Sequence, residues 1–437
     1  DGTIPPQDKT TICGYIKNIN PDIVLFNYLN PTESSGASNL PEQVLFRSKC
    51  DQEKWFLYDG TGTVFDPNDT VGNAGDVVVP SGGFQAYQIN HSDNTNADSA
   101  GLNAGDWYAR MQHSYADGSD SYGSGDWNTQ GFGTRHEYGF DGPYQDIFRY
   151  EPRTDGDWDF DGDSDPKTGD IARSAKLSGD HNFMDEMDAI WDGPTLPLQI
   201  GNVTQNPGID TNDLTKFAEA KQYGRENFPR NGGILEGFIT GKTSSIEVFA
   251  GWDPLMRYYR RSFELYTDFS PVYIILHCST DVVPATHTDF EWGRYALCTS
   301  LMDNGYFGFN PENFTDQIIL NEFEIDMGQP VESIRDPAFD PSTDVSGSGY
   351  LPYQGGLYKR EYYNPATDRY YIALCNPKGN GDQNVTLPTR AGYQWNRLDA
   401  TSFPDPSQDP SVNDGATNVT SQFLEQRKGI ILEGVSV

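Results

Sequence analysis

The chain has 437 residues, and its 64 acidic and 30 basic side chains give a formal net charge of −34. DNA or an anionic membrane surface would be repelled before it docked, so nucleic-acid binding is excluded. Such acidity also suits salty water, where screening weakens self-repulsion. No run of about 18 apolar residues occurs, so no membrane insertion is expected. The length fits one large barrel of about 250 to 300 residues with a smaller second domain.

Up to about residue 317, short apolar runs that end in polar residues alternate with helical patterns, which is typical of parallel β/α units. The pattern predicts seven strands, at residues 23–29, 83–89, 138–147, 197–202, 233–238, 271–276 and 306–309. It predicts helices at about 9–20, 183–191, 213–223, 253–266 and 288–304. Asp253 and Pro254 look like an N-cap and first helical residue, and Thr288 with Glu291 forms a capping box.

Seven strands are one short of a (β/α)₈ barrel. The missing strand should precede the first helix, so we expect a first strand that is missing or truncated because the true N-terminus lies upstream. An incomplete barrel is the alternative. From about Asn321 the pattern changes to alternating apolar and polar runs, at residues 323–326, 357–362, 369–374 and 429–432. The predicted organisation is α/β, with a TIM-like barrel over residues 1–317 and a small antiparallel β-domain over 318–437.

Carboxylates at strand ends are the first candidates for chemistry, because reactive groups of such barrels lie at the C-terminal ends of the strands. Asp141 and Asp146 lie on the predicted strand 138–147, and Glu236 lies on 233–238. Glycoside hydrolysis needs one carboxyl group to donate a proton and a second to attack the sugar or activate water. The apolar neighbours of Glu236 would keep water away from it, which suits the donor, and an ionised Asp146 suits the other role. The alternative is that these acids cap helices or pair with arginine.

Polar and aromatic residues near predicted strand ends favour a saccharide cleft, because sugar rings pack on aromatic faces. The candidate substrate-binding residues are Asn30, Asn90, Asp141, Tyr144, Asn202, Trp252 and His277. For any one of them, core packing or a structural hydrogen bond is the alternative. The sequence contains no hydrolase serine motif, phosphate loop or His/Cys cluster with metal spacing.

Residues 157–163 resemble a calcium loop, with oxygen ligands at alternating positions and a glycine for the turn. The candidate metal ligands are Asp157, Asp159, Asp161 and Asp163. Position twelve is Thr168 where a calcium loop has glutamate, although Asp165 or Asp170 could substitute. A solvated acidic loop is the alternative. Ca²⁺ is the one cofactor that the sequence predicts, and no organic cofactor is expected.

Residues 139–146, Gly-Phe-Asp-Gly-Pro-Tyr-Gln-Asp, resemble the G-x-D-G-x-x-x-D strand of the TIM-barrel glycosidases known as the hypothetical glycosyl hydrolase 15-like group. That group is related to endo-α-1,4-polygalactosaminidase and α-galactosidase-type barrels. The resemblance extends to residues 21–30, 198–202, 325–330, 356–361 and 373–377 and to the segment around Glu236. It implies that Asp146 is the nucleophile and Glu236 the acid/base of a retaining mechanism.

The sequence therefore predicts a glycoside hydrolase that acts on a polysaccharide or oligosaccharide. The alternative is a non-catalytic extracellular carbohydrate-binding or assembly-forming protein on the same barrel. Whether the protein forms a homo-oligomer stays open. We expect a secreted or cell-surface glycoprotein, with sequons at Asn68, Asn90, Asn202, Asn313, Asn384 and Asn418. Two states of the cysteines are possible: a disulfide between Cys13 and Cys50, or five free thiols.

Overall fold

The computed structural model describes residues 22–29, 33–35, 41–53, 55–57, 86–90, 92, 95, 97–117, 142–145, 169–190, 198, 200–202, 214, 218, 231–240, 251–266, 270–279, 288–310, 320–399 and 412–437. The chain divides into two compact units. The first unit comprises residues 1–208, 215–233 and 265–272, and the second comprises 209–214, 234–264 and 273–437.

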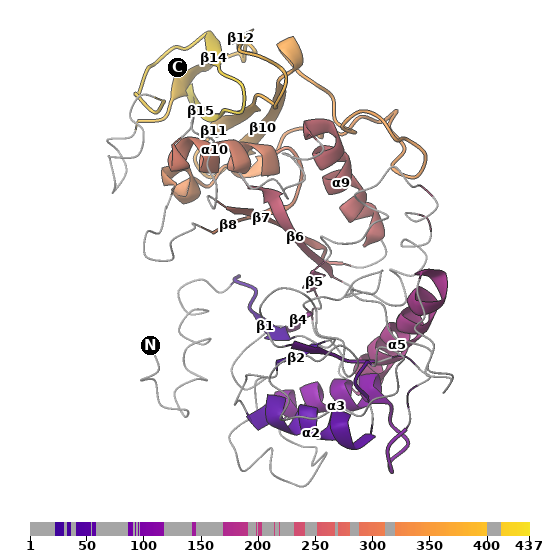
Figure 1. Ribbon diagram of the computed structural model, residues 1–437. Helices are drawn as coiled ribbons and strands as arrows, with labels where there is room; N and C mark the ends of the chain where they lie inside the picture. Colours follow the sequence, from indigo (N-terminus) through magenta and orange to yellow (C-terminus); the bar gives the residue numbers. More distant parts are fainter. Residues whose placement is uncertain are drawn as a thin grey trace. The chain divides into compact units, whose positions relative to one another are not determined.

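The described part of the first unit contains parallel strands and three long helices (Figure 1). Strands β1 (Phe26–Leu29), β4 (Gly142–Gln145) and β5 (Ile200–Asn202) lie in that order and run parallel. The helices are α2 (Pro41–Glu53), α3 (Ala104–Asp117) and α5 (Gly169–Ile190). Aromatic rings join them, since Tyr108 of α3 lies 4.8 Å from Phe46 of α2 and 6.2 Å from Phe183 of α5.

One predicted barrel strand has a different partner. Strand β3 (Ala86–Gln88) pairs antiparallel with β2 (Glu33–Ser35), in a two-stranded sheet apart from the parallel strands. An isolated antiparallel bridge between Phe56 and Ile89 continues this pairing. The prediction of a parallel barrel strand at 83–89 is therefore wrong. A short apolar run has the same sequence pattern whichever neighbour offers it hydrogen bonds.

The second unit begins with three strands and two helices of the β/α type. Strands β6 (Gly232–Ile239), β7 (Tyr273–Ser279) and β8 (Tyr306–Asn310) are neighbours in that order, and β7 and β8 are parallel. Helices α9 (Trp252–Leu265) and α10 (Asp289–Ser300) follow β6 and β7 in the chain. All five elements were predicted, because their apolar periods are long and clear.

The two faces of these strands differ in burial. On β7, the fully buried Ile274, Leu276 and Cys278 alternate with half-buried residues. Cys278 pairs with Phe309 of β8, and the ring of Phe309 lies 3.2 Å from the Cβ position of Gly293 in α10. The buried face is therefore the face that the helices cover (Figure 1). We call the other face, which carries the half-buried residues, the open face.

The predicted helix starts can be compared with the structure. The Thr288 hydroxyl accepts a hydrogen bond from the Glu291 N–H at 3.2 Å, and the Glu291 carboxylate accepts one from the Thr288 N–H at 2.8 Å. The predicted capping box is thus confirmed. Helix α9 begins at Trp252, two residues before the predicted first helical residue Pro254, so Asp253 lies in its first turn and not at its N-cap.

The C-terminal part of the second unit is an antiparallel β region, as predicted. Five strands are ordered β13 (Tyr393–Arg397), β15 (Gly429–Ser436), β11 (Arg369–Cys375), β10 (Tyr358–Asn364) and β9 (Gln329–Pro330). A second sheet pairs β12 (Gln383–Thr386) with β14 (Ser421–Leu424). Side chains of both sheets, among them Ile372, Leu432 and Leu424, share one apolar core.

The predicted strand at 323–326 is wrong. Residues Asn321–Glu324 form the 3₁₀ helix η3 instead. Phe323 is 43% exposed, whereas its neighbour Glu322 is buried in an ion pair with Arg294 of α10. The alternation that predicted a strand therefore does not separate a buried from an exposed face here. A second 3₁₀ turn, η4, covers Gln354–Gly356.

Helix α10 packs directly against the β region (Figure 1). A Cβ atom on Gly429 of β15 would lie 2.7 Å from the Cβ of Cys298, so the two backbones approach closely. Beyond the helix, Asp303 accepts hydrogen bonds from Arg335 at 2.8 Å and from the Tyr350 hydroxyl at 2.6 Å. Burial, with the charge of Asp303, raises the pKa of Tyr350 well above its usual value, which keeps this hydroxyl a donor.

The described residues thus show parallel strands with helices and an antiparallel β region. Closure of the strands into a barrel stays a prediction, and so does a domain boundary after residue 317. No helix in the described ranges is long and apolar enough to cross a membrane.

Candidate functional site

The strand that carries Glu236 is irregular. Leu235 and Phe238 are both fully buried, although residues three apart in a regular strand point to opposite faces. Gly237, between them, has a φ of +70°, in the left-handed region that glycine adopts without strain. Together these features indicate a β-bulge, which adds one residue and changes the alternation. The Phe238 ring meets Tyr259 of α9 at 5.5 Å, so Phe238 lies on the helix-covered face.

Glu236 consequently points to the open face, and its side chain is exposed. The expectation that apolar neighbours would keep water from this carboxyl group is wrong, because those neighbours point the other way. Glu236 also lies within β6, three residues before the strand ends at Ile239. Its access to solvent therefore does not depend on a position at the strand end.

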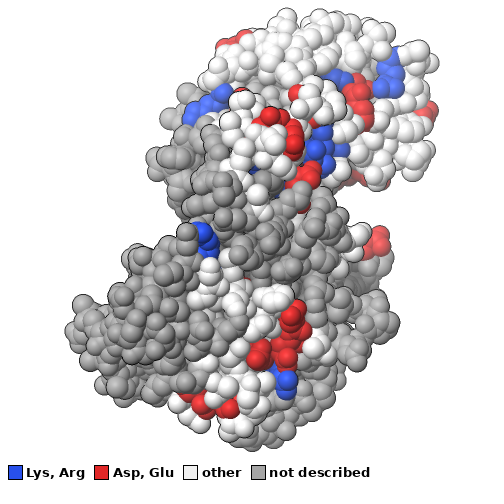
Figure 2. Space-filling view, turned by 90° about the vertical axis from the view of Figure 1, so that its right-hand side faces the viewer, with Lys and Arg blue, Asp and Glu red and all other residues white. Residues whose placement is uncertain are grey.

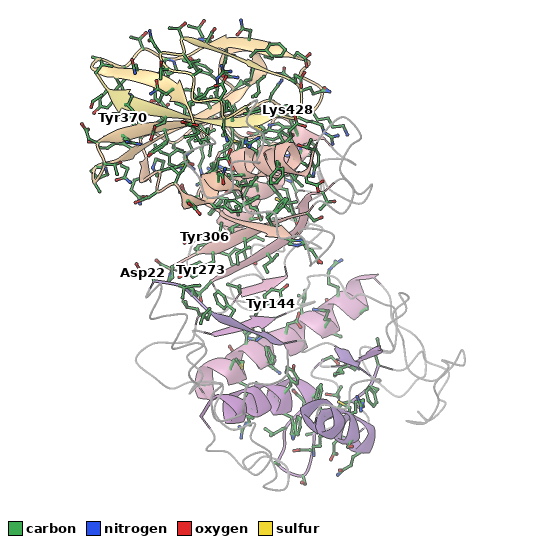
Figure 3. All side chains as sticks on the ribbon, turned by 90° about the vertical axis from the view of Figure 1, so that its left-hand side faces the viewer. Asp22, Tyr144, Tyr273, Tyr306, Tyr370 and Lys428 are labelled. Atoms are coloured by element: carbon green, nitrogen blue, oxygen red, sulfur yellow. The ribbon has the colours of Figure 1, made fainter. Side chains whose placement is uncertain are left out.

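Other functional groups lie on the same open face. His277 pairs with Gly308 of β8, and Ile275 pairs with Tyr306. The rings of Tyr273 and Tyr306 lie side by side with centroids 5.5 Å apart, as Figure 3 shows, and Tyr306 is 53% exposed. His277 was predicted to follow its strand, but β7 extends to Ser279 and includes it. The open face therefore carries a carboxylate, an imidazole and two phenols.

Three of the predicted binding residues in the first unit lie in the described ranges. Asn202 ends β5, as predicted, and Tyr144 is half-buried in β4 between its partners Tyr28 and Ile200. Asn90 is 1% exposed, and its side-chain oxygen accepts a hydrogen bond from the Ser92 N–H at 3.1 Å. This contact is a local turn, and such burial disfavours glycan attachment to Asn90. The binding roles of these residues stay predictions.

Several predicted residues lie outside the described ranges: Asn30, Asp141, Asp146, and the calcium candidates Asp157, Asp159, Asp161 and Asp163. The separation of the two catalytic candidates and the calcium site therefore stay predictions, as does the pairing of Cys13. Within the ranges given above, no three or more His, Cys, Asp or Glu side chains are grouped so that they could hold a metal ion.

The described thiols of the second unit do not suit a nucleophile. Cys278, Cys298 and Cys375 are buried. Burial raises the pKa of Cys278 and of Cys298 far above the usual range, so both remain protonated at neutral pH.

Trp252 lies beside a hollow at the start of α9. The side chain is 4% exposed, and its ring lies 5.3 Å from that of Tyr358 and 6.2 Å from that of Tyr295. Together with Asp253 and Lys378 it lines a hollow of about 380 Å³. A second hollow of about 400 Å³ is lined by Asp253, Tyr358 and the loop around residues 336–352. The second hollow could not be predicted from the sequence, because its lining comes from segments far apart in the chain.

No protein-family model matches the sequence, and no curated protein matches it. Among solved structures, the chain is similar to an α-amylase from Geobacillus thermoleovorans, with 11% identity, a TM-score of 0.42, and coverage of 99% of this chain and 81% of that one. A glucosidase from Croceicoccus marinus gives 10% identity and a TM-score of 0.32, over 76% of this chain and 74% of that one. A GH36 α-galactosidase from Geobacillus stearothermophilus gives 11% identity and a TM-score of 0.32, over 97% of this chain and 46% of that one. Likeness at this level identifies neither a family nor an activity.

Proposed function

We propose that this protein is a glycoside hydrolase that acts on a polysaccharide or oligosaccharide with two carboxylates. Glu236 is the acid/base and Asp146 is the nucleophile of a retaining mechanism. One observation carries the proposal: Glu236 is an exposed carboxylate on the open face of the strands, between the fully buried Leu235 and Phe238. Bulges often re-aim a side chain beside an active site, and the bulge at Gly237 supports such a role here.

The surroundings of Glu236 suit a sugar substrate. Substrate can reach an exposed carboxylate from solvent, and the proton donor must approach the leaving oxygen to within hydrogen-bond distance. Tyr273 and Tyr306, on the same face, offer aromatic surface for a sugar ring. The net charge of −34 repels anionic glycans, so we propose a neutral substrate. A retaining mechanism requires the Asp146 carboxyl group about 5 to 5.5 Å from that of Glu236.

The proposal includes secretion to the medium or cell surface and Ca²⁺ at Asp157, Asp159, Asp161 and Asp163. Both parts are supported by the sequence alone, through the sequons and the spacing of the aspartates.

The first test is the Glu236→Gln variant, with release of reducing ends from a panel of neutral plant and marine polysaccharides as the measurement. Loss of the proton donor should lower turnover roughly 10²- to 10⁴-fold. Glu324→Gln is the matched control, because Glu324 is also exposed but belongs to η3. Equal turnover of Glu236→Gln and the parent protein would refute the assignment.

The two carboxylates can be told apart by rescue. Azide should restore turnover of an activated aryl glycoside in both variants, but with products of different configuration. In Glu236→Ala it attacks the glycosyl-enzyme intermediate and gives a glycosyl azide of retained configuration, whereas in Asp146→Ala it displaces the leaving group directly and gives the inverted azide. The opposite pair of configurations would exchange the two roles. A parent protein that binds the polysaccharides and hydrolyses none would instead be the non-catalytic carbohydrate-binding protein.

A further inference from the structure

The two hollows at the start of α9 adjoin each other, and both lie within the second unit. The first lies between the first turn of α9 and the turn at residues 377–380, which joins β11 to β12. The second lies between the same helical turn and the loop around residues 336–352. Asp253 and Tyr358 line both hollows, so the two hollows are neighbours that share one wall. We call the pair the α9 groove.

The wall formed by the loop is held rigidly. Arg257 and Arg261 of α9 are 5% and 1% exposed, and they donate hydrogen bonds to backbone carbonyls of the loop. Arg257 donates to the carbonyl of Gly347. Arg261 donates to the carbonyls of Pro341 and, at 2.9 Å, of Asp344. Burial, with the nearby charge of Arg257, lowers the pKa of Arg261 to about 10. Burying two guanidinium groups is costly, so the loop conformation is strongly specified.

The opposite wall is also preformed. The Asn380 side chain donates hydrogen bonds to the Gly355 carbonyl at 2.8 Å and to the Asn376 side-chain oxygen at 2.9 Å. At the junction of the hollows, the Tyr358 hydroxyl lies 2.9 Å from the Ser348 hydroxyl. A groove whose walls are already ordered loses little conformational entropy when a ligand binds.

The groove offers carboxylate oxygens at its centre and in its second hollow. Asp253 is exposed, and its carboxylate accepts no hydrogen bond and forms no ion pair with any residue in the described ranges. Asp336 and Asp344 line the second hollow, and each uses one oxygen for a backbone N–H of the loop, at 2.8 and 2.7 Å. Lys378 lines the first hollow. The lining therefore holds three carboxylates and one ammonium group.

We propose that the α9 groove is a second saccharide-binding site, which holds neighbouring units of a neutral glycan chain in its two hollows, apart from the reaction at Glu236. Adjacent hydroxyls of a sugar present two donors that suit one carboxylate, as at Asp253. Two hollows of this size with shared lining suit a ligand made of repeated units. The excess of carboxylates rejects anionic glycans. The choice of a saccharide as ligand rests on the proposed function, whereas the existence of the groove follows from its lining residues alone.

The test uses the full chain with Glu236→Gln, so that bound glycan is not consumed. Calorimetry with neutral hexose oligosaccharides measures binding to this protein and to the same protein with Asp253→Ala or Asp289→Ala. Asp289 is the matched control, because it is an exposed aspartate in the first turn of α10. Loss of hydrogen bonds to a charged group should weaken binding about tenfold or more for Asp253→Ala and leave Asp289→Ala unchanged.

Equal affinity of the Asp253→Ala and Asp289→Ala proteins would overturn the proposal. The proposal would also be overturned if the protein bound no neutral oligosaccharide but did bind a basic peptide such as hexalysine, and if salt and Asp253→Ala both weakened that binding. Asp253→Asn, which keeps the size of the side chain, repeats the measurement if Asp253→Ala melts at a lower temperature than the control. Failure of the proposed function has a different sign: the Glu236→Gln protein, with Asp253 unchanged, would release reducing ends as fast as the parent protein.

Discussion

Glu236 shows how a single backbone conformation sets the environment of a functional group. Its neighbours in sequence are apolar, and Leu235 and Phe238 are indeed fully buried. In a regular strand Glu236 and Phe238 would point to the same face, and the φ of +70° at Gly237 lets them point to opposite faces. Glu236 therefore lies on the face opposite to both buried side chains, and it is exposed.

We expect Gly237→Ala to lower both stability and turnover. An alanine Cβ would meet no atom within 4 Å, so the change tests the backbone alone. The left-handed conformation costs an L-residue roughly 1 to 2 kcal/mol, and relief of that strain would turn Glu236 away from the open face. Denaturant unfolding and reducing-end release measure the two effects.

Gly392→Ala is the control for this backbone change. Gly392 has a φ of +79°, and its Cβ would also meet no atom within 4 Å, but it precedes β13 in the β region. It should lose a similar free energy of unfolding and keep its turnover. Equal turnover of both variants would mean that the bulge does not orient the catalytic group.

At the level of elements, α10 joins the two parts of the second unit. One of its sides meets β8 through Gly293 and Phe309, and another meets β15 through Cys298 and Gly429. Its start could be predicted, because both members of the capping box lie within one turn. Its packing against β15 could not, because more than a hundred residues separate the two elements along the chain.

Removing the cap should destabilise this unit. Thr288→Ala removes the hydroxyl that accepts the Glu291 N–H, at an expected cost of about 1 kcal/mol in the free energy of unfolding. Thr288→Ser keeps the hydroxyl and should retain most of that free energy. If serine cost as much as alanine in denaturant unfolding, the hydrogen bond of the cap would not be the cause.

At the level of the whole molecule, negative charge exceeds positive charge by 34. On the described surface in Figure 2, basic side chains lie next to acidic ones. The ion pairs of Arg335 with Asp303 and of Arg390 with Glu361 are examples of this compensation. With the basic groups paired in this way, the remaining acidic groups repel one another.

We expect the melting temperature to rise with ionic strength between about 0.01 and 0.15 M, where the Debye length falls from about 30 to 8 Å. Sodium and potassium chloride should act alike, and the effect should shrink near pH 5, where part of the carboxylates bind protons. A melting temperature that is independent of salt at neutral pH would show that repulsion does not limit stability. An effect of one cation alone would point to specific ion binding.

Features that depend on neighbouring residues could be predicted from the amino-acid sequence: the strands β6, β7 and β8, the helices α9 and α10, the cap at Thr288 and the β character of the C-terminal region. Apolar period and capping chemistry are local, so one chain segment contains the whole signal. Four features required the folded molecule: the partner of β3, the 3₁₀ turn at Asn321–Glu324, the direction of Glu236 and the loop held on α9 by Arg257 and Arg261. These depend on contacts between residues far apart in the chain, where many partners satisfy the same local pattern and the packing of the whole unit selects one.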